Sequence, residues 1–436
     1  MKLDQKIYTE RRRALLDSLK EGSVLVLPSA TEKVRNRDCE YHFRQDSDFW
    51  YLTGFGEPEA VLVLIPGREE GESVLFCRER NREMEIWNGR RAGQAGAVKE
   101  YGFDQAFVIS ELNEQMPGLL DQRTSVYHTP GANKEFDQQL WSWMDKVRAK
   151  ERKGGVAPEQ IEDRDKLLHT LRMIKSPAEQ ALMRKAGEIS ARAHTRAMQE
   201  CKPGVTEYQL EASIHHEFAM SGARHPAYTT IVGGGENACI LHYTENECEL
   251  KDGDLVLIDA GCELDHYAAD ITRTFPVNGK FSPEQKALYN VVLDAQLAAI
   301  DEVAPGKPFD GFHKAALGKL VEGLLELGLL AGNKDKLIKE EAYRAFYMHG
   351  TGHWLGMDVH DVGHHKEDGE SILFKPGMAV TVEPGLYVSP DNQDVEERWR
   401  GIGIRIEDDV LVTETGNEVL TAGVVKTVDA IEALMG

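Results

Sequence analysis

The chain has 436 residues, of which 41% are hydrophobic and 28% charged, and its formal net charge is −22. Since this length exceeds what one ordinary hydrophobic core supports, we expect two domains. The negative charge argues against nucleic acids and anionic membranes as partners. No apolar run approaches the roughly 18 residues that would span a bilayer.

The N-terminal stretch MKLDQKIYTERRRALLDSLKEG is charged from its start and lacks the apolar core of a signal peptide. We expect it to form a polar amphipathic helix. The six cysteines show neither a CxxC pair nor zinc-finger spacing. Without an export signal, they are expected to be reduced thiols in a cytoplasmic protein. Cys262 follows a DAG motif, but a small residue packing a strand is the interpretation we favour for it.

The first third of the chain alternates strand-like and helical patterns. Three Val- and Leu-rich runs bounded by Gly or Pro begin at Gly22, Glu59 and Glu72, and they predict strands. Segments 112–122 and 134–150 carry apolar residues at helical spacing. This pattern predicts an α/β domain with a mostly buried sheet.

A break follows at residues 153–165, where Gly, Pro and charged residues suit a domain linker. Ser176, followed by Pro177 and Glu179, predicts a helix that starts with a capping box. The same device recurs at Ser282, before a second long helix. Helical and strand-like segments then follow in a similar order twice, which internal duplication would explain.

The second domain contains four further strand-like segments, 254–261, 266–277, 379–388 and 403–416. We expect the first two to form a hairpin that turns near GCELDH. Five side chains of metal-ligand type occur in tight local motifs: Asp259, Asp270, His353, Glu383 and Glu407. The four carboxylates are expected to lie on strands and His353 at a Gly-rich turn, because rigid elements position ligands well.

Four carboxylates and one imidazole make a hard, oxygen-rich metal site. One divalent ion does not need four carboxylates, whereas two ions that share bridging carboxylates do. Such a pair clamps and activates a water for hydrolysis. Mn(II) suits this ligand set, and Zn or Co would also fit it.

The run HGTGHWLGMDVHD, from His349 to Asp361, together with these five side chains resembles the pita-bread metallopeptidases of family M24. Segments 43–55, 85–93 and 240–247 are similar to bacterial aminopeptidase P, and the resemblance covers essentially the whole chain. It implies an α/β (α+β) fold. A creatinase-like α/β domain would occupy residues 1–172, and a pita-bread catalytic domain residues 173–436.

The resemblance also implies how the ligands divide between two divalent ions, which we expect to be manganese. Asp259 would chelate one ion, and Asp270 and Glu407 would bridge both. His353 and Glu383 would complete the coordination of the other ion. Each of these roles is an expectation from the family pattern.

Further polar residues are expected around the substrate. The resemblance places His242 and His349 near the scissile bond and His360 on the substrate carbonyl, where a hydrogen-bond donor stabilises developing charge. Arg405 and Tyr387 are expected to orient the ligands. His225 lies where similar enzymes vary, so no role is assigned to it.

The implied activity is release of the N-terminal residue from peptides with proline at the second position, through attack by a hydroxide that bridges the ions. Proline nitrogen in a peptide carries no hydrogen, so the leaving nitrogen must be protonated. Glu383 could accept a proton from the water and pass it on. The expected partners are therefore peptides, with no nucleic acid and no membrane.

Four alternatives share parts of the pattern. Prolidase has the same ligands but needs a cationic anchor for the carboxylate of an Xaa-Pro dipeptide, and methionine aminopeptidase usually lacks a large N-terminal domain. Creatinase lacks the ligand set. A non-catalytic peptide-binding module would have no reason to keep a costly buried charge cluster.

In similar enzymes the N-terminal domain mediates oligomerisation and contributes to the active-site mouth of a neighbouring subunit. The resemblance therefore implies a homo-oligomer, a tetramer or a dimer. Trp87 could take part in such a mouth, or it could pack in the core of its own domain.

Overall fold

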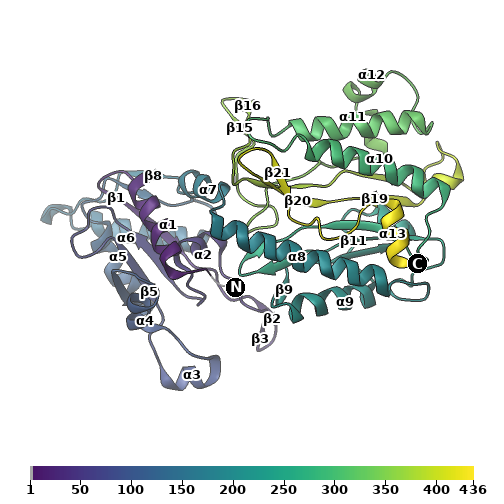
Figure 1. Cartoon of the computed structure of the whole chain (residues 1–436). Helices are drawn as coiled ribbons and strands as arrows, with labels where there is room; N and C mark the ends of the chain where they lie inside the picture. Colours follow the sequence, from purple (N-terminus) through teal and green to yellow (C-terminus); the bar gives the residue numbers. More distant parts are fainter. Residues whose placement is uncertain (1–2) are drawn as a thin grey trace. The chain divides into compact units, whose positions relative to one another are not determined.

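A computed structural model describes residues 3–436 of the chain. The described residues divide into two compact units, residues 3–172 and 173–436, and each mixes helices with sheets (Figure 1). The expectation of a mixed α/β fold is confirmed. Within the described range, no helix combines the length and apolar character that a bilayer crossing requires.

The N-terminal unit is built on a six-stranded sheet with the order β6-β5-β4-β1-β7-β8. Its strands are β1 (Ser23–Pro28), β4 (Val61–Leu64), β5 (Ser73–Cys77), β6 (Gln105–Val108), β7 (Ser125–Tyr127) and β8 (Gln160–Glu162). Strands β1, β4 and β5 confirm the three predicted strands. Strand β8 lies inside the segment 153–165, so the prediction of a linker there is wrong: Val126 and Ile161 pair in the sheet.

The helices of this unit are α1 (Gln5–Ser18), α2 (Ser47–Thr53), α3 (Arg82–Asn88), α4 (Gly93–Lys99), α5 (Leu112–Leu120), α6 (Lys134–Arg148) and α7 (Asp165–Met173), and a small hairpin joins β2 (Val34–Asn36) to β3 (Cys39–Glu40). Helix α1 confirms the expected N-terminal helix, and α5 and α6 confirm the two helical patterns. The buried ring of Trp143 packs in the core under α6 and donates from Nε1 to Asn113 Oδ1 at 2.8 Å.

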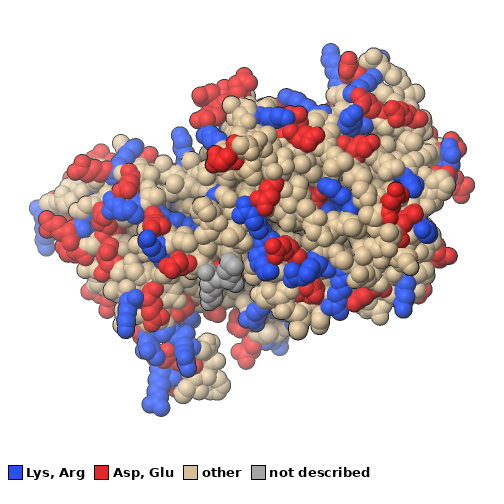
Figure 2. Space-filling model, in the orientation of Figure 1, with Lys and Arg blue, Asp and Glu red and all other residues tan. Residues whose placement is uncertain are grey.

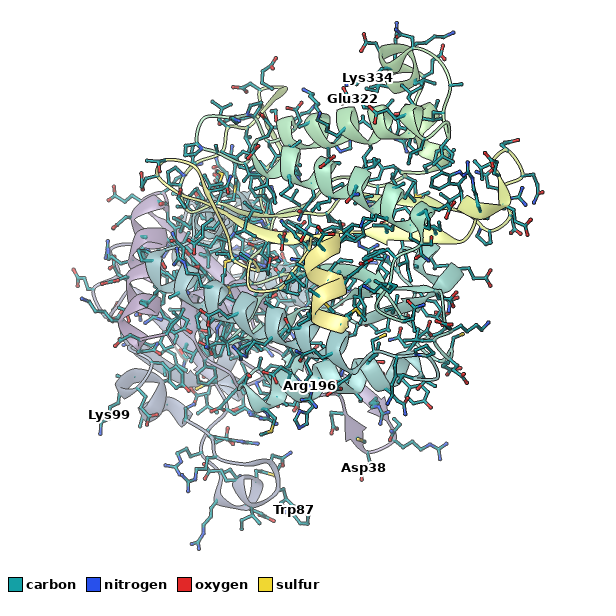
Figure 3. All side chains as sticks on the ribbon, turned by 45° about the vertical axis from the view of Figure 1, so that its right-hand side comes forward. Asp38, Trp87, Lys99, Arg196, Glu322 and Lys334 are labelled. Atoms are coloured by element: carbon teal, nitrogen blue, oxygen red, sulfur yellow. The ribbon has the colours of Figure 1, made fainter. Side chains whose placement is uncertain are left out.

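Helix α3 differs from the other helices of the unit because it buries no residue. Trp87 is 81% exposed and Ile86 76% exposed, so core packing of Trp87 is excluded. Figure 3 shows Trp87 on a segment that extends away from the sheet of its unit. On the face drawn in Figure 2, acidic and basic side chains are interspersed, and basic side chains gather around this segment.

The C-terminal unit contains α8 (Pro177–Glu200), α9 (Glu207–Met220), α10 (Pro283–Ile300), α11 (Gly311–Glu326), α12 (Lys334–Lys339) and α13 (Val428–Met435). Helix α8 packs on α9, and α10 packs on α11. The strands lie between these two helix pairs (Figure 1). The predicted capping boxes at Ser176 and Ser282 are both present at the starts of α8 and α10.

The strands of this unit are β9 (His225–Pro226), β10 (Ile231–Gly234), β11 (Leu255–Asp259), β12 (Cys262–Leu264), β13 (Tyr267–Ala268), β14 (Thr272–Pro276), β15 (Lys366–Glu367), β16 (Glu370–Ser371), β17 (Ala379–Val382), β18 (Gly385–Val388), β19 (Ile402–Arg405), β20 (Asp408–Val412) and β21 (Asn417–Val419). They form the sheets β10-β11-β14, β13-β12-β9, β17-β20-β21, β18-β19 and β15-β16. Strands β11 and β14 pair antiparallel, as predicted. Their connection is more than a turn, because β12 and β13 form a second hairpin within it.

Two ladders, β11–β14 and β17–β20, end in the same way. The β11–β14 ladder ends at the pair Asp259 and Thr272, with Asp270 two residues before β14. The β17–β20 ladder ends at Val382 and Asp408, so Glu383 and Glu407 lie directly beyond it. The expectation that all four carboxylates lie on strands is therefore correct only for Asp259. Side chains inside a ladder stand perpendicular to the sheet, whereas residues beyond its end are free to turn toward a common centre.

Candidate active site

A cavity of about 810 Å³ opens in the C-terminal unit where these ladders end. All nine predicted site residues line it: His242, Asp259, Asp270, His349, His353, His360, Glu383, Arg405 and Glu407. The structure therefore brings together residues from sequence positions that are up to 165 apart, counted from 242 to 407.

The innermost group is formed by Asp270, His353 and Glu407. Each offers one ligand atom, and these atoms lie within 4.8 Å of one another. His353 Nε2 is 3.3 Å from Asp270 Oδ2 and 3.6 Å from Glu383 Oε1. Asp259 is fixed beside them, because Arg405 Nη2 donates to its Oδ2 at 2.6 Å.

The orientation of the His353 ring fits a cation. Its Nδ1 lies 2.9 Å from the main-chain oxygen of Trp354, so Nδ1 carries the hydrogen that this carbonyl accepts. In the neutral ring, the lone pair of Nε2 then points at the carboxylate oxygens of Asp270 and Glu383. A lone pair facing carboxylates is favourable only with a positive charge between them, and a histidine whose other nitrogen donates to a carbonyl is the usual metal-ligand arrangement.

The electrostatics of the carboxylates lead to the same conclusion. Burial raises the pKa of Asp259, Glu383 and Glu407, and neighbouring carboxylates add to the rise for Glu407; the pKa of Glu383 reaches about 7. Arg405 is the one Lys or Arg among the described residues that line the cavity. One guanidinium cannot compensate four clustered carboxylates, and buried charge is costly unless it is paired or bound to metal. The donor set therefore fits divalent cations.

Charged neighbours fix the main chain of two of these residues. The fully buried Arg273 donates from Nη1 to the main-chain oxygen of Glu407 at 2.6 Å and from Nη2 to Asp408 Oδ1 at 2.7 Å. The carboxylate of Asp409 accepts the main-chain N–H of Asp270 at 3.2 Å. Both carboxylates expected to bridge two ions are thus held through their main chain as well as their side chains.

His349 is held as a neutral ring on the cavity wall. Arg405 Nη1 donates to the hydroxyl of Tyr387 at 3.1 Å, which leaves that hydroxyl to donate to His349 Nε2 at 2.8 Å. His349 Nδ1 lies 2.7 Å from the main-chain oxygen of Gly350 and donates to it. Burial, with the charge of Arg405, lowers the pKa of His349 to about 4.

The other two histidines are more exposed. The ring of His360 lies beside that of His353, with 4.2 Å between their centroids. His242 is an exposed residue of the segment 240–248, which contains no helix or regular strand. Three histidines of different exposure therefore surround the carboxylates, whereas His225 lies on β9 and is not among the residues lining the cavity.

Two functional candidates were missed by the sequence analysis. The hydroxyl of Tyr228 donates to Asp259 Oδ1 at 2.5 Å, and that of Thr272 donates to Glu407 Oε2 at 2.6 Å. No local pattern marks Tyr228, because its partner is 31 positions away. Thr272 had a usable signal: it stands two residues after Asp270, the spacing that returns a side chain to the same face of an extended strand.

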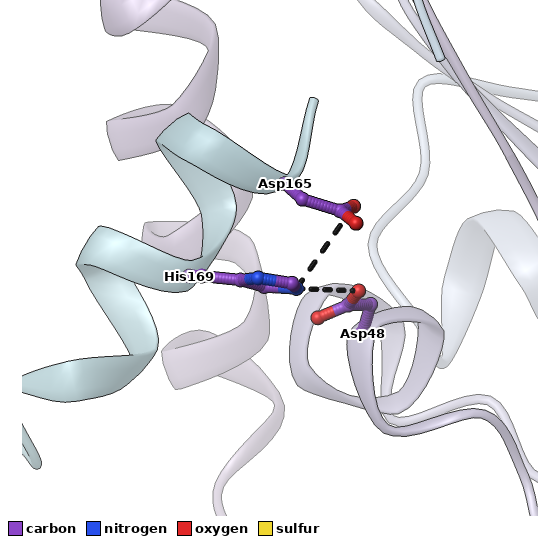
Figure 4. A group of neighbouring side chains, drawn as sticks. All are labelled: Asp48, Asp165 and His169. Carbon is purple, nitrogen blue, oxygen red and sulfur yellow. Dashed lines mark hydrogen bonds and ion pairs between the residues drawn. The ribbon is translucent and has the colours of Figure 1, made fainter. Parts of the chain in front are cut away.

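A second group of metal-ligand type, Asp48, Asp165 and His169, lies in the N-terminal unit (Figure 4). Its central carboxylate is already engaged. Asp48 accepts from Arg172 Nη1 at 2.6 Å and lies 3.2 Å from His169 Nε2. Burial alone would raise the pKa of Asp48, but His169 and Arg172 hold it well below its usual range. The group is a closed ion-pair network and needs no cation.

Comparison with known proteins identifies the family. The model of metallopeptidase family M24 matches residues 181–414, and that of the aminopeptidase P N-terminal domain matches residues 8–127. The chain belongs to the aminopeptidase P group of family M24. It is 52% identical to the Xaa-Pro aminopeptidase of Escherichia coli over 98% of this chain and 97% of that one.

Solved structures agree with this assignment. The aminopeptidase PepP of Pseudomonas aeruginosa matches with a TM-score of 0.99 and 56% identity, covering 100% of this chain and 98% of that one. Two structures of Escherichia coli aminopeptidase P, one with the inhibitor Pro-Leu and one zinc-substituted with product, match with TM-scores of 0.96 and 0.97. Both are 51% identical and cover 100% of this chain and 99% of theirs.

The raised pKa values predict how stability depends on metal and pH. Because burial raises the pKa of Glu383 to about 7, the folded state binds this proton more tightly than the unfolded state does. Protonated Glu383 therefore adds fully to the free energy of unfolding below the pKa of the unfolded chain, and this addition is lost as pH rises through 7. His353, whose pKa is raised to about 9, acts in the same direction. From Glu383 alone, the free energy of unfolding of metal-stripped protein should therefore fall by about 3 kcal/mol relative to that of metal-loaded protein between about pH 5 and pH 8.

Thermal denaturation of stripped and Mn(II)-loaded protein across this pH range measures the difference. A bound divalent ion replaces the proton that the cluster otherwise needs, so the gap in Tm should widen as pH rises. A gap that stays constant or narrows would contradict this account of the cluster.

Proposed function

We propose that this protein is a Xaa-Pro aminopeptidase, a metal-dependent hydrolase that releases the N-terminal residue from peptides with proline in second position. The observation that carries this proposal is the convergence of four carboxylates and His353 in one cavity of an M24 chain. The full-length identity of 52% to an Xaa-Pro aminopeptidase supports the same reaction class.

We infer that the cavity takes two divalent ions and that manganese is the native metal. Asp259, Asp270, His353, Glu383 and Glu407 would hold them, with Asp270 and Glu407 shared. When bound, the ions supply Lewis acidity that activates the attacking water and polarises the scissile carbonyl. The preference for manganese rests on ligand chemistry, because carboxylates with a single imidazole suit Mn(II).

Glu383 is the residue that we assign to proton transfer. Its carboxylate lines the cavity beside the other metal ligands, where it would accept a proton from the attacking water. Its Oε1 also accepts from Thr381 Oγ1 at 3.4 Å, which limits its rotation. The proton would go from water to a Glu383 oxygen and then to the proline nitrogen, which carries no hydrogen of its own.

The three histidines are assigned to contacts with the substrate. Held as a donor–acceptor chain with Tyr387 and Arg405, His349 would contact the substrate as a neutral ring. His360 would donate to the carbonyl oxygen as negative charge develops there, which its position beside His353 supports. His242 would contact the substrate from the irregular segment 240–248.

The hydrogen bonds of Arg405 argue for longer peptides, rather than Xaa-Pro dipeptides, as substrates. A prolidase needs a cation for the substrate carboxylate, but the guanidinium of Arg405 is already bound to Asp259, Tyr387 and Thr272. No other Lys or Arg lines the cavity in the described part of the chain. We therefore expect substrates that continue beyond proline, because the described cavity-lining residues offer no uncommitted cation to bind the carboxylate of an Xaa-Pro dipeptide.

The direct test compares two substrates. Metal-stripped protein, with and without added Mn(II), is incubated with an Xaa-Pro-Yaa tripeptide and with an Xaa-Pro dipeptide, and release of the first residue is measured. We expect metal-dependent cleavage of the tripeptide and little of the dipeptide. Cleavage of the dipeptide alone would make the enzyme a prolidase. Cleavage of neither substrate would favour a non-catalytic binding module.

Two substitutions separate proton transfer from carbonyl stabilisation. Glu383→Ala should lower kcat by about 1,000-fold or more, because it removes both a ligand and the proton carrier. His360→Ala should lower kcat by about 100-fold with metal content unchanged. The exposed His364, which is not among the cavity-lining residues, provides the control His364→Ala.

Steady-state kinetics and metal analysis, with Tm as a check on folding, distinguish these roles. A folded Glu383→Ala variant with more than about half the wild-type rate would remove the role assigned to Glu383. A His360→Ala variant without metal would make His360 a ligand instead.

We further infer a homo-oligomer, a dimer or tetramer, in which the N-terminal domain contributes to the interface and to the active-site mouth of a neighbour. The exposed apolar residues Ile86 and Trp87 on α3 support this role, since such patches mark interaction sites. Trp87→Ala should shift assembly by at least about 30-fold in Kd, as expected for a buried interface aromatic.

Sedimentation velocity over a range of concentrations measures this shift. Trp141, 40% exposed on α6, gives the matched control Trp141→Ala. Unchanged assembly of the Trp87→Ala protein would exclude α3 from the interface.

We expect a cytoplasmic location. The six cysteines are free thiols in the structure, and a buried one such as Cys262 has a pKa raised by burial to about 12. Free thiols suit a reducing compartment. Cell fractionation against compartment markers tests this expectation.

A further inference from the structure

The segment 240–248 places His242 at the cavity without the support of a helix or regular strand. A residue in an irregular segment needs other anchors, because catalytic contacts depend on positions held to a fraction of an ångström. The buried side chains in this segment are Tyr243, 6% exposed, and Asn246, 2% exposed. Both point away from solvent, and their partners determine where His242 lies.

One carboxylate holds both ends of the longer stretch 234–248, which contains this segment. Glu207, the first residue of α9, is fully buried. Its Oε1 accepts from the main-chain N–H of Gly234 at 2.8 Å and from Asn237 Nδ2 at 3.0 Å. Its Oε2 accepts from the hydroxyl of Tyr243 at 2.8 Å and from the main-chain N–H of Cys248 at 2.9 Å.

These four donors belong to two places in the chain. Gly234 and Asn237 precede the irregular segment, whereas Tyr243 and Cys248 lie within it and at its end. The single carboxylate of Glu207 is therefore hydrogen-bonded to both ends of the loop 234–248. The ring of Tyr243 also packs in a cluster with Leu257 and Tyr387, and the Tyr387 hydroxyl contacts His349 and Arg405. The anchored tyrosine thus connects the loop to the wall of the active site.

We propose that Glu207 is a positioning residue of the peptidase: its buried carboxylate holds the loop 234–248 so that His242, next to Tyr243, contacts the substrate. This inference rests on the proposed function for the consequence in catalysis, but the clamp itself is a property of the fold. Glu207 acts through His242 and touches neither substrate nor metal ligand.

A carboxylate is suited to this role by its chemistry. An ionised carboxylate only accepts hydrogen bonds, and all four partners of Glu207 are donors. Glu207→Gln preserves the shape but replaces one oxygen by an NH₂ group. The hydroxyl of Tyr243 can turn to accept from this group, but whichever oxygen is replaced, the main-chain N–H of Gly234 or Cys248 loses its acceptor. A buried donor left without an acceptor is destabilising, so the change should release one end of the loop without creating a cavity.

A double-mutant cycle with His242→Ala tests the proposal. Glu207→Gln should lower kcat/KM on an Xaa-Pro-Yaa tripeptide by about 100-fold in the wild-type background, the loss expected for a displacement of about 1 Å. In the His242→Ala background the same change should cost less than about twofold, because residues that act through one another are not additive. Metal content should be the same in all four proteins.

The matched control is Glu217→Gln, the same substitution on the same helix. Glu217 pairs with Arg192 at 3.2 Å and accepts from Ser221, outside the loop. It should leave kcat/KM unchanged. If Glu207→Gln does not fold, Tyr243→Phe removes one of the four hydrogen bonds and should give a smaller loss with the same non-additivity.

Hydrogen exchange measured by mass spectrometry supplies a readout besides activity. Exchange in peptides covering 240–248 should increase in Glu207→Gln and remain as in wild type in Glu217→Gln. Equal losses of kcat/KM in both His242 backgrounds, unchanged kcat/KM, or unchanged exchange in the loop would each overturn the proposal. A wild-type protein that cleaves no Xaa-Pro peptide would instead refute the proposed function, and the exchange result would still decide whether Glu207 holds the loop.

Discussion

The structure of the catalytic unit depends on holding four buried carboxylates together against their mutual repulsion. Burial alone disfavours the charged form of each, as the raised pKa values of Asp259, Glu383 and Glu407 show. The fold resists their separation mainly through the main chain. Arg273 binds the carbonyl of Glu407, and two antiparallel ladders stop where the ligands begin. The repulsion that remains is what makes the cluster a strong site for divalent cations.

The two ladders supply equivalent pairs of carboxylates. Asp259 ends β11, Glu383 directly follows β17, and Asp270 and Glu407 precede the partner strands β14 and β20. Each ladder follows a helix pair, α8–α9 or α10–α11, and each first helix begins with Ser-Pro and a capping box. A repeated unit of two helices and a ladder therefore explains how a site of four carboxylates arises, because each of the two units contributes two of them. The imidazole of His353 has no counterpart in the other unit's ligand pair.

The sequence predicts elements with local signals and misses contacts that depend on packing. Strands β1, β4 and β5 follow from Val- and Leu-rich runs, and the capping box at Ser176 marks its helix directly. Strand β8 was missed because three residues with an exposed start carry no apolar pattern and are stabilised by pairing with β7. The ligands were found because each has a tight local motif, whereas Tyr228 reaches Asp259 only through the folded sheet.

The cavity combines a rigid side with an irregular one, and this division suits the reaction. The carboxylates emerge from ladder ends and keep their spacing, since a displaced ligand would no longer fit a bound cation. The substrate, in contrast, must enter, and proline prevents the extended main-chain pairing that could hold an ordinary peptide. In the proposed reaction, recognition would fall to side chains such as His242 and His360, on segments that lack regular structure. Buried polar anchors such as Glu207 allow those segments to remain open to solvent while their histidines keep a defined position.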